Sequence, residues 1–165
     1  MALIPLLIKE LKDETAITRT FLSQIPDDKF SWKPHEKSMS IKQLAGHLAE
    51  LPGWVSMALH TDGLDFEAGD YKPTDINTSA ELVKLLDENL QNSVTALQNA
   101  KEADLDPIWT MRMGEKILAK WTKYEVIRHA LAQQIHHRAQ LGVDFRLLDI
   151  PVPSTYGPSA DVQSF

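Results

Sequence analysis

Three of the chain's six histidines, His129, His136 and His137, lie within one short stretch, VIRHALAQQIHHRAQLGVDFRLL (residues 126–148). Two imidazoles four residues apart on one helix face can chelate a first-row metal ion. Positions 129, 133 and 137 have that spacing, but position 133 is Gln. Successive helical residues are rotated by roughly 100°, so His136 points away from His137. The stretch is either a metal site best aimed at Gln133 and His137, with one imidazole replaced, or a core helix with polar residues on its flank.

His47 is a further candidate ligand, on a helix that we expect to begin after Ser40. It lies roughly 50° from the centre of that helix's apolar stripe, so it points into or along the edge of the interior. The simpler interpretation is a core-edge histidine satisfied by a hydrogen bond. The alternative is a site of His47, Gln133 and His137. A neutral amide oxygen would hold Zn²⁺ or Ni²⁺ there less tightly than a third imidazole, and positions for water or substrate would remain. His129 could orient Gln133 or a water.

Four segments with helical periodicity must position these residues: 4–25, 41–58, 82–97 and 127–145. Three of them follow a capping box, in which Ser or Thr precedes Gln or Glu by three residues: Ser40 and Gln43, Thr78 and Glu81, Thr122 and Glu125. No long stretch alternates apolar and polar residues, as a half-buried strand would. The pattern therefore predicts an all-α helical bundle in a single domain, residues 1–165.

Two parts of this pattern are irregular. Pro52 interrupts the second helix, because it lacks an N–H and its ring crowds the carbonyl group of residue 48, so we expect a kink beside Gly53. Residues 102–121 are the least regular segment. They are consistent with a short helix or with two extended pieces around Gly114.

Composition limits the class of protein. The chain has 165 residues, a net charge of −6 and no cysteine. The acidic balance argues against broad nucleic-acid binding, which needs clustered Lys and Arg. Disulfides, thiolate metal sites and a cysteine nucleophile are excluded. The apolar start, MALIPLLIKELKDE, has no basic flank or cleavage site and is too short to span a bilayer, which needs about 20 residues. We expect a cytoplasmic protein with no membrane contact.

The C-terminal residues 149–165, DIPVPSTYGPSADVQSF, form a Pro-rich segment called the strap below. Its prolines predict an extended path, packed along the bundle with Tyr156 anchored by its hydroxyl group, or else a lid or dimer contact. Other candidate residues are assigned simpler roles: packing, dimer contact or surface for His136 and Arg138, solvent exposure for His35 and His60, and core or pocket wall for Trp54, Trp109 and Trp121.

Two motifs, SMSIKQLAGHLAEL and QQIHHRAQLGVDFRLLDIPVPSTYGPSAD, together resemble the DinB family of DinB/YfiT-like metalloproteins. The resemblance covers most of the chain and implies an up-down four-helix bundle, often a homodimer, with a divalent metal at one end. It also implies ligands at the positions of His47, Gln133 and His137. The family usually has His where Gln133 stands, and Gly where Ala139 stands. Because Gln133 replaces the usual His, the resemblance alone does not give the identity of the metal or the affinity for it.

The same resemblance implies two hypotheses for function. Family members include S-transferases that use bacillithiol or mycothiol and a mycothiol-dependent maleylpyruvate isomerase, in which the metal stabilises the thiolate of the cofactor. A chain without cysteine is compatible with sulfur supplied by such a low-molecular-weight thiol. The first hypothesis is therefore a metal-dependent thiol S-transferase acting on a small molecule. The second is a metal-poor, non-enzymatic bundle that binds a small molecule or serves as a dimeric interaction protein.

Overall fold

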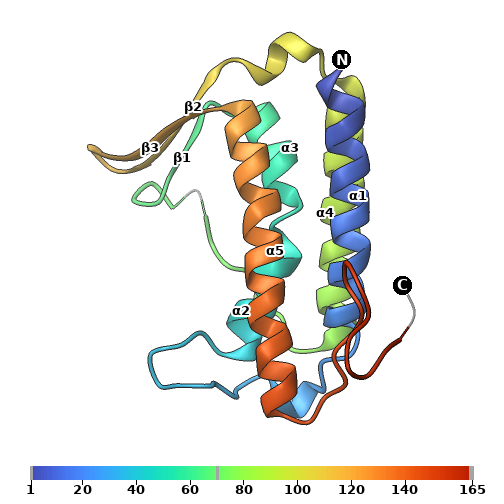
Figure 1. Ribbon diagram of the computed structural model, residues 1–165. Helices are drawn as coiled ribbons and strands as arrows, with labels where there is room; N and C mark the ends of the chain where they lie inside the picture. Colours follow the sequence, from blue (N-terminus) through green and yellow to red (C-terminus); the bar gives the residue numbers. More distant parts are fainter. Residues whose placement is uncertain (1, 70, 164–165) are drawn as a thin grey trace.

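The computed structural model describes residues 2–69 and 71–163, and its helices pack side by side along one axis (Figure 1). In chain order the helices are α1 (Leu3–Leu22), η1 (Asp27–Lys29), α2 (Ile41–Glu50), α3 (Gly53–His60), α4 (Ser79–Asn99), η2 (Glu102–Leu105) and α5 (Lys123–Leu147), where η denotes a 3-10 helix. α2 and α3 follow one another and together run beside α4 and α5, while α1 packs on α4 and α5. No helix in these residues is both long and apolar enough to cross a bilayer.

All three predicted capping boxes form. Ser40, Thr78 and Thr122 each accept a hydrogen bond from the backbone N–H three residues later, and the side chain of that residue accepts one in return. These contacts satisfy N–H groups that have no partner inside the helix. The starts of α2, α4 and α5 are thus specified locally, by residues that can be recognised in the sequence.

The second helix is interrupted at Pro52, as the sequence predicts, and Leu51 and Pro52 keep helical backbone angles across the interruption. α2 ends at Glu50 and α3 begins at Gly53. Two side chains of α4 satisfy carbonyl groups beside the break: Ser93 Oγ donates to the oxygen of Pro52 at 2.7 Å, and Asn89 Nδ2 donates to that of Ala49 at 3.0 Å. The interruption is therefore stabilised by the neighbouring helix, and it lies one turn after His47.

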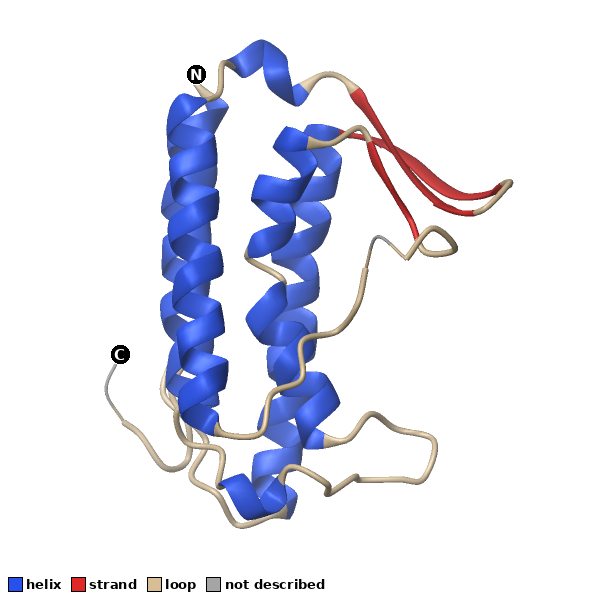
Figure 2. Ribbon diagram, turned by 180° about the vertical axis from the view of Figure 1, so that it is seen from behind, coloured by secondary structure: helices blue, strands red, loops and turns tan. Residues whose placement is uncertain are grey.

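A three-stranded mixed sheet stands beside the helices (Figure 2). β1 (Gly63–Asp65) pairs in parallel with β2 (Ile108–Met113), and β2 pairs in antiparallel fashion with β3 (Lys116–Thr122). The prediction of an all-α, up-down four-helix bundle is therefore wrong. Of the two expectations for residues 102–121, two extended pieces around Gly114 are found, after the short helix η2.

The sheet escaped prediction because little of it is buried. β3 has no fully buried residue, and Trp109 on β2 is the main anchor, with no exposed surface and an indole N–H that donates to Thr61 Oγ1 at 2.9 Å. A strand without a buried face need not alternate apolar and polar residues. Two glycines permit the pairing. Gly114 turns between β2 and β3 with φ of 57°, and a Cβ at Gly63 would lie 2.3 Å from the oxygen of Thr110.

The strap follows α5 and is held by a buried ion pair. Arg138 is 2% exposed and donates to the Glu14 carboxylate at 2.6 Å and to Thr18 Oγ1 at 3.1 Å. The Tyr156 hydroxyl group accepts from Arg138 at 2.7 Å and donates to Glu14 at 2.7 Å. Arg138 thus belongs to the packing between α1, α5 and the strap.

Candidate metal centre

His47 and His137 meet between α2 and α5. Their ring centroids are 4.9 Å apart, with an angle of 79° between the ring planes. Both side chains are half-buried. Ring nitrogens bind Zn²⁺ at about 2 Å, so two rings this close can reach one ion after a modest rotation of one of them. The structure therefore brings together two of the three residues that the sequence singled out as ligands.

Burial sets the charge state of this pair. Desolvation lowers the pKa of His47, and the neighbouring rings of His137 and His129 lower it further, against an opposing effect of Glu50. Desolvation also lowers the pKa of His137, with a smaller contribution from His136, and is partly offset by a hydrogen bond to Gln140. Both rings consequently favour the neutral form at neutral pH. Only a neutral imidazole has the lone pair that a metal ion requires.

Gln140 orients His137. The Nδ1 atom of His137 lies 2.8 Å from Gln140 Oε1, three residues later on α5. Because an amide oxygen accepts, Nδ1 carries the proton and the lone pair is left on Nε2. Metal-binding histidines commonly have one ring nitrogen held in this way. His136 lies edge-on to the His137 ring at 4.9 Å between centroids while its own side chain stays exposed.

Gln133 and His129 occupy the two preceding turns of α5. Gln133 is half-buried and, among the residues described, its amide has no hydrogen-bond partner. His129 stacks on Trp121, with centroids 4.9 Å apart and 26° between the rings. Its effect on the pKa of His47 places it in the same electrostatic environment. No hydrogen bond joins it directly to Gln133 in the described residues, and its role in orienting Gln133 or a water stays a prediction.

The donor set has the character of an open site. Within residues 2–69 and 71–163, no three His, Cys, Asp or Glu side chains converge as a metal site would require. Two imidazoles fit a divalent ion that takes its remaining ligands from a weaker donor, water or substrate. Gln133 is the residue of this chain that we expect to serve as that weaker donor.

Two hollows flank the histidine pair and share Met39. One has a volume of about 380 Å³ and contains His137, Gln140 and Asp144 of α5. The other, about 370 Å³, contains His47 and Glu50 of α2. In the second hollow Tyr71 donates to Glu50 at 2.6 Å, and burial followed by this hydrogen bond raises the pKa of Tyr71. Small-molecule sites have volumes in this range.

The sequence analysis missed most of the residues in these hollows. Met39 precedes a capping box, Glu50 follows His47 by three residues, and Asp144 follows His137 by seven. Helical spacing could have identified Glu50 and Asp144 as neighbours of the histidines on the same helices. Nothing in the sequence pattern links Met39 and Tyr71 to the site, because each reaches it from a loop.

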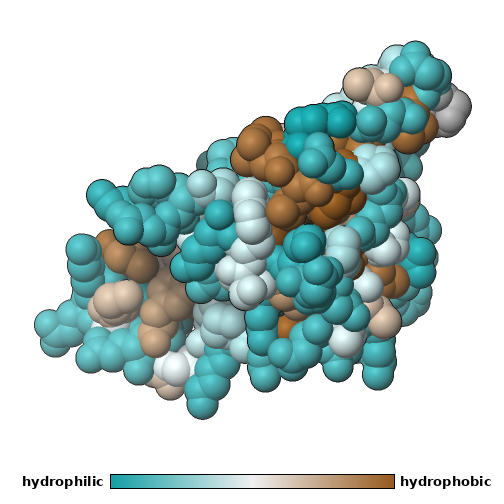
Figure 3. Space-filling model, turned by 90° about the horizontal axis from the view of Figure 1, so that it is seen from below, coloured by the Kyte–Doolittle hydropathy of each residue, from teal (hydrophilic) through white to brown (hydrophobic). Residues whose placement is uncertain are grey.

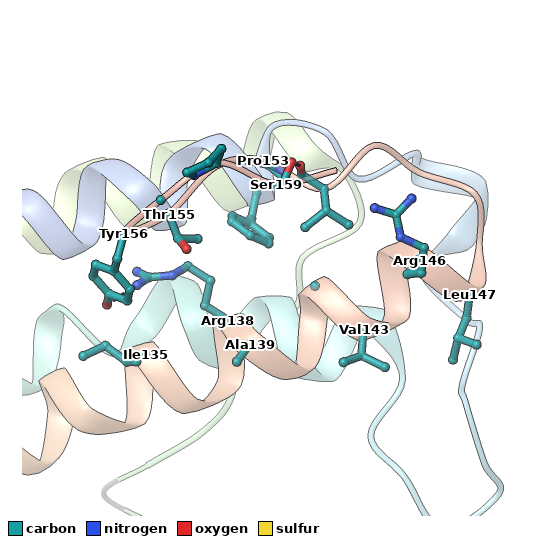
Figure 4. Close-up of a pocket in the computed structure, with 15 residues that line it drawn as sticks. Ile135, Arg138, Ala139, Val143, Arg146, Leu147, Pro153, Thr155, Tyr156 and Ser159 are labelled. Carbon is teal, nitrogen blue, oxygen red and sulfur yellow. Dashed lines mark hydrogen bonds between the residues drawn. The ribbon is translucent and has the colours of Figure 1, made fainter. Parts of the chain in front are cut away.

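A larger hollow, about 490 Å³, lies between α5 and the strap (Figure 4). The charged groups that line it already form ion pairs within the protein. Arg146 pairs with Asp161, and the Arg138 guanidinium lies 5.6 Å from the centre of the Tyr156 ring in addition to its ion pair with Glu14. The charged groups of this hollow are thus already paired within the protein, whereas the histidine pair is not, so the histidine pair is the better candidate site.

Comparisons with known proteins identify the family and the fold of this chain. The model of the DinB family matches residues 2–163. A DinB-like protein from Bacillus subtilis is 20% identical with a TM-score of 0.69, and the match covers 96% of this chain and 99% of that one. For a DinB-like protein from Bacillus cereus the values are 18%, 0.70, 91% and 95%.

A more distant fold match is the mycothiol-dependent maleylpyruvate isomerase, which is 12% identical with a TM-score of 0.55. That match covers 81% of this chain and 59% of the isomerase. No curated protein matches the sequence significantly. At these identities the solved structures establish a shared fold, whereas the family model spans nearly the whole sequence. The chain therefore belongs to the DinB family.

Proposed function

We propose that this chain is a divalent-metal-dependent enzyme that transfers a low-molecular-weight thiol, of the bacillithiol type, to a small electrophile. The observation that carries the proposal is the half-buried imidazole pair of His47 and His137, 4.9 Å apart between two hollows. Zn²⁺ or Ni²⁺ suits such ligands. The mycothiol-dependent isomerase supports thiol chemistry as a function that this fold can accommodate.

Each residue has a definite part in this proposal. His47 and His137 would hold the ion through neutral rings, and Gln133 would add a weak third ligand. A bound metal would stabilise the thiolate form of the cofactor, a better nucleophile than the thiol at neutral pH. Gln140 holds Nδ1 of His137, which leaves Nε2 as the nitrogen that would bind the ion. In the transfer a carbon–sulfur bond forms, the thiol proton is lost, and the leaving group departs with its electron pair.

Metal content tests the first part. Protein without a polyhistidine tag is loaded with Zn²⁺ or Ni²⁺, dialysed and analysed by mass spectrometry of the elements. We expect about one equivalent, falling at least tenfold in His47→Ala and in His137→Ala. His35→Ala is the matched control, since His35 is exposed in a loop and lines neither hollow. Less than about a tenth of an equivalent in the loaded wild type would exclude a metal enzyme.

Thiol transfer tests the second part. The metal-loaded protein is mixed with bacillithiol, or with mycothiol as a second arm, and with 1-chloro-2,4-dinitrobenzene, from which the sulfur displaces chloride. We expect conjugate formation that depends on the metal and is lost in His47→Ala. Binding of metal with no acceleration over the uncatalysed reaction by either thiol would contradict the proposed reaction while leaving the metal site in place.

A second candidate is a metal-poor, non-enzymatic small-molecule-binding protein. It is favoured by Gln133, because the described residues offer two imidazoles and no third His, Cys, Asp or Glu to complete the site. The same metal analysis separates the two candidates.

A further inference from the structure

Asp144 is a buried carboxylate that the metal centre does not use. It lies on α5, seven residues after His137, and is 5% exposed. It lines the hollow of about 380 Å³ that also contains His137 and Gln140. Burial raises the pKa of Asp144, and no compensating cause opposes this effect.

The other buried polar residues of the described chain are all satisfied. The eight are hydrogen-bonded through their side chains: Glu14, Thr15, Thr18, Ser40, Ser93, Lys123, Gln134 and Arg138. The Asp144 carboxylate has no hydrogen-bond or ion-pair partner among the residues described. The two arginines of this part of α5 do not provide one, because Arg138 pairs with Glu14 and Arg146 with Asp161.

An unpaired carboxylate of this kind costs free energy unless something occupies the hollow. Buried charges in proteins are normally paired, and those left unpaired at neutral pH concentrate at binding sites. Every fully shielded side-chain N or O atom among the described residues has a hydrogen-bond partner. Because the Asp144 oxygens have none, they must retain some exposed surface, and the residue lines the hollow. The carboxylate is thus available to a ligand.

The residues that line the hollow indicate the charge and polarity of its ligand. Met39, Leu44 and Val143 provide apolar surface, and Gln140 and Asp144 provide polar groups on one face of α5. A carboxylate repels anions and would remain unpaired against a purely apolar ligand. A single carboxylate is also too few oxygen ligands for a hard metal ion. A cationic nitrogen on a short hydrocarbon chain satisfies both the charge and the apolar walls.

We propose that this hollow binds a small molecule with a primary ammonium group, which pairs with the Asp144 carboxylate. If the function proposed above holds, on which this step rests, that molecule is an amine-bearing thiol whose sulfur end lies at the histidine pair. Seven residues of helix separate Asp144 from His137, a rise of about 10 Å. The ligand's nitrogen and sulfur are therefore separated by a chain of several bonds.

The test uses metal-free protein and hexylamine, followed by two-dimensional NMR of the amide signals. We expect saturable shifts in residues of the hollow, with an affinity at least about tenfold lower in Asp144→Asn, as the loss of a charge-assisted hydrogen bond implies. Asp149→Asn is the matched control, since it removes the same charge from an exposed position five residues away and Asn tolerates its φ of 56°. Its affinity should equal that of the wild type.

Hexanol and hexanoate, which have the same chain and no positive charge, should bind at least tenfold more weakly than hexylamine. Equal binding of hexylamine to wild type and Asp144→Asn, or equal binding of hexanol and hexylamine, would overturn the ammonium site. Because no metal, thiol or electrophile is present, this result does not depend on S-transfer. A second arm with 6-aminohexane-1-thiol and Zn²⁺ tests the thiol assignment: tighter binding than hexylamine supports it, and equal binding overturns it.

Discussion

Gln133 stands one helical turn before His137, where the DinB family usually has a histidine, and its amide has no hydrogen-bond partner among the described residues. His47 and His137 already lie in contact. The affinity for metal therefore depends on what position 133 contributes. An amide oxygen is a neutral, weaker donor than imidazole for Zn²⁺ and Ni²⁺.

Replacing Gln133 by His should tighten binding of Zn²⁺ at least tenfold, because a third imidazole would complete a three-histidine set. Isothermal titration of metal-free protein measures this change. Gln134→His is a suitable control, since Gln134 is buried on another face of α5 and its amide bonds to Thr15. An unchanged affinity in Gln133→His would show that position 133 does not face the histidine pair.

His47 should make the protein less stable in mild acid. Burial first, and then the neighbouring His137, lower its pKa below the ordinary 6.5, so the folded chain binds this proton more weakly than the unfolded chain. Its contribution to stability is complete above the unfolded pKa and is lost as the pH falls through the folded pKa. Urea unfolding at pH 7.5 and 5.5 should show a smaller acid loss in His47→Gln than in the wild type. An identical loss in both, with His35→Gln as control, would contradict this assignment.

At the scale of elements, the site depends on where helices stop and what crosses them. α2 ends after His47 because of Pro52, and the α4 side chains of Ser93 and Asn89 satisfy the carbonyl groups beside the break. The strap, at the C-terminal end of the chain, is held against α1 and α5 by the hydrogen bonds of the Tyr156 hydroxyl group to Glu14 and Arg138. Both arrangements join segments far apart in the sequence.

Tyr156→Phe should lower the free energy of unfolding by about 1–2 kcal/mol, because it removes the hydroxyl group that bridges Arg138 and Glu14. The ring, and with it most of the packing, is retained. Urea denaturation gives the value. Tyr124→Phe is the control, since the Tyr124 hydroxyl group has no hydrogen-bond partner among the described residues and its loss should change little. Equal effects of the two substitutions would show that the Tyr156 bridge does not hold the strap.

At the scale of the whole molecule, one end of the bundle carries the last turns of α5, the loop before α2 and the strap. Hydrophobic side chains gather in a patch among hydrophilic ones at this end (Figure 3). The side chains of Val143 and Leu147 on α5 are 61% and 59% exposed. Exposed apolar surface of this kind commonly marks association or ligand binding.

The family resemblance implies a homodimer, and we expect sedimentation equilibrium to give twice the mass of the chain at micromolar concentration. Association would cover apolar surface that a single chain leaves exposed. A single-chain mass over the whole accessible concentration range would contradict the expected dimer. The measurement is made with and without Zn²⁺, so that metal-dependent association is recognised.

The sequence by itself determined the features that depend on neighbouring residues. Capping boxes and apolar periodicity located the starts of α2, α4 and α5, and the spacing on α5 separated His137 from His136 as a candidate ligand. Gly114 marked the turn in one of the two alternatives that the sequence left open for residues 102–121. Each of these signals acts within a few residues, where the backbone's own hydrogen bonds and φ angles decide the structure.

Only the tertiary structure decided the sheet, the hollows and the isolation of Asp144. β1 and β2 are joined by pairing across more than forty residues, as in Gly63 with Thr110. No local alternation of apolar and polar residues predicts this pairing. The hollow at His137 forms from a loop before α2 and the end of α5. A carboxylate is recognised as unpaired only when every neighbouring group is in place, because burial and charge pairing are sums over residues distant in the chain.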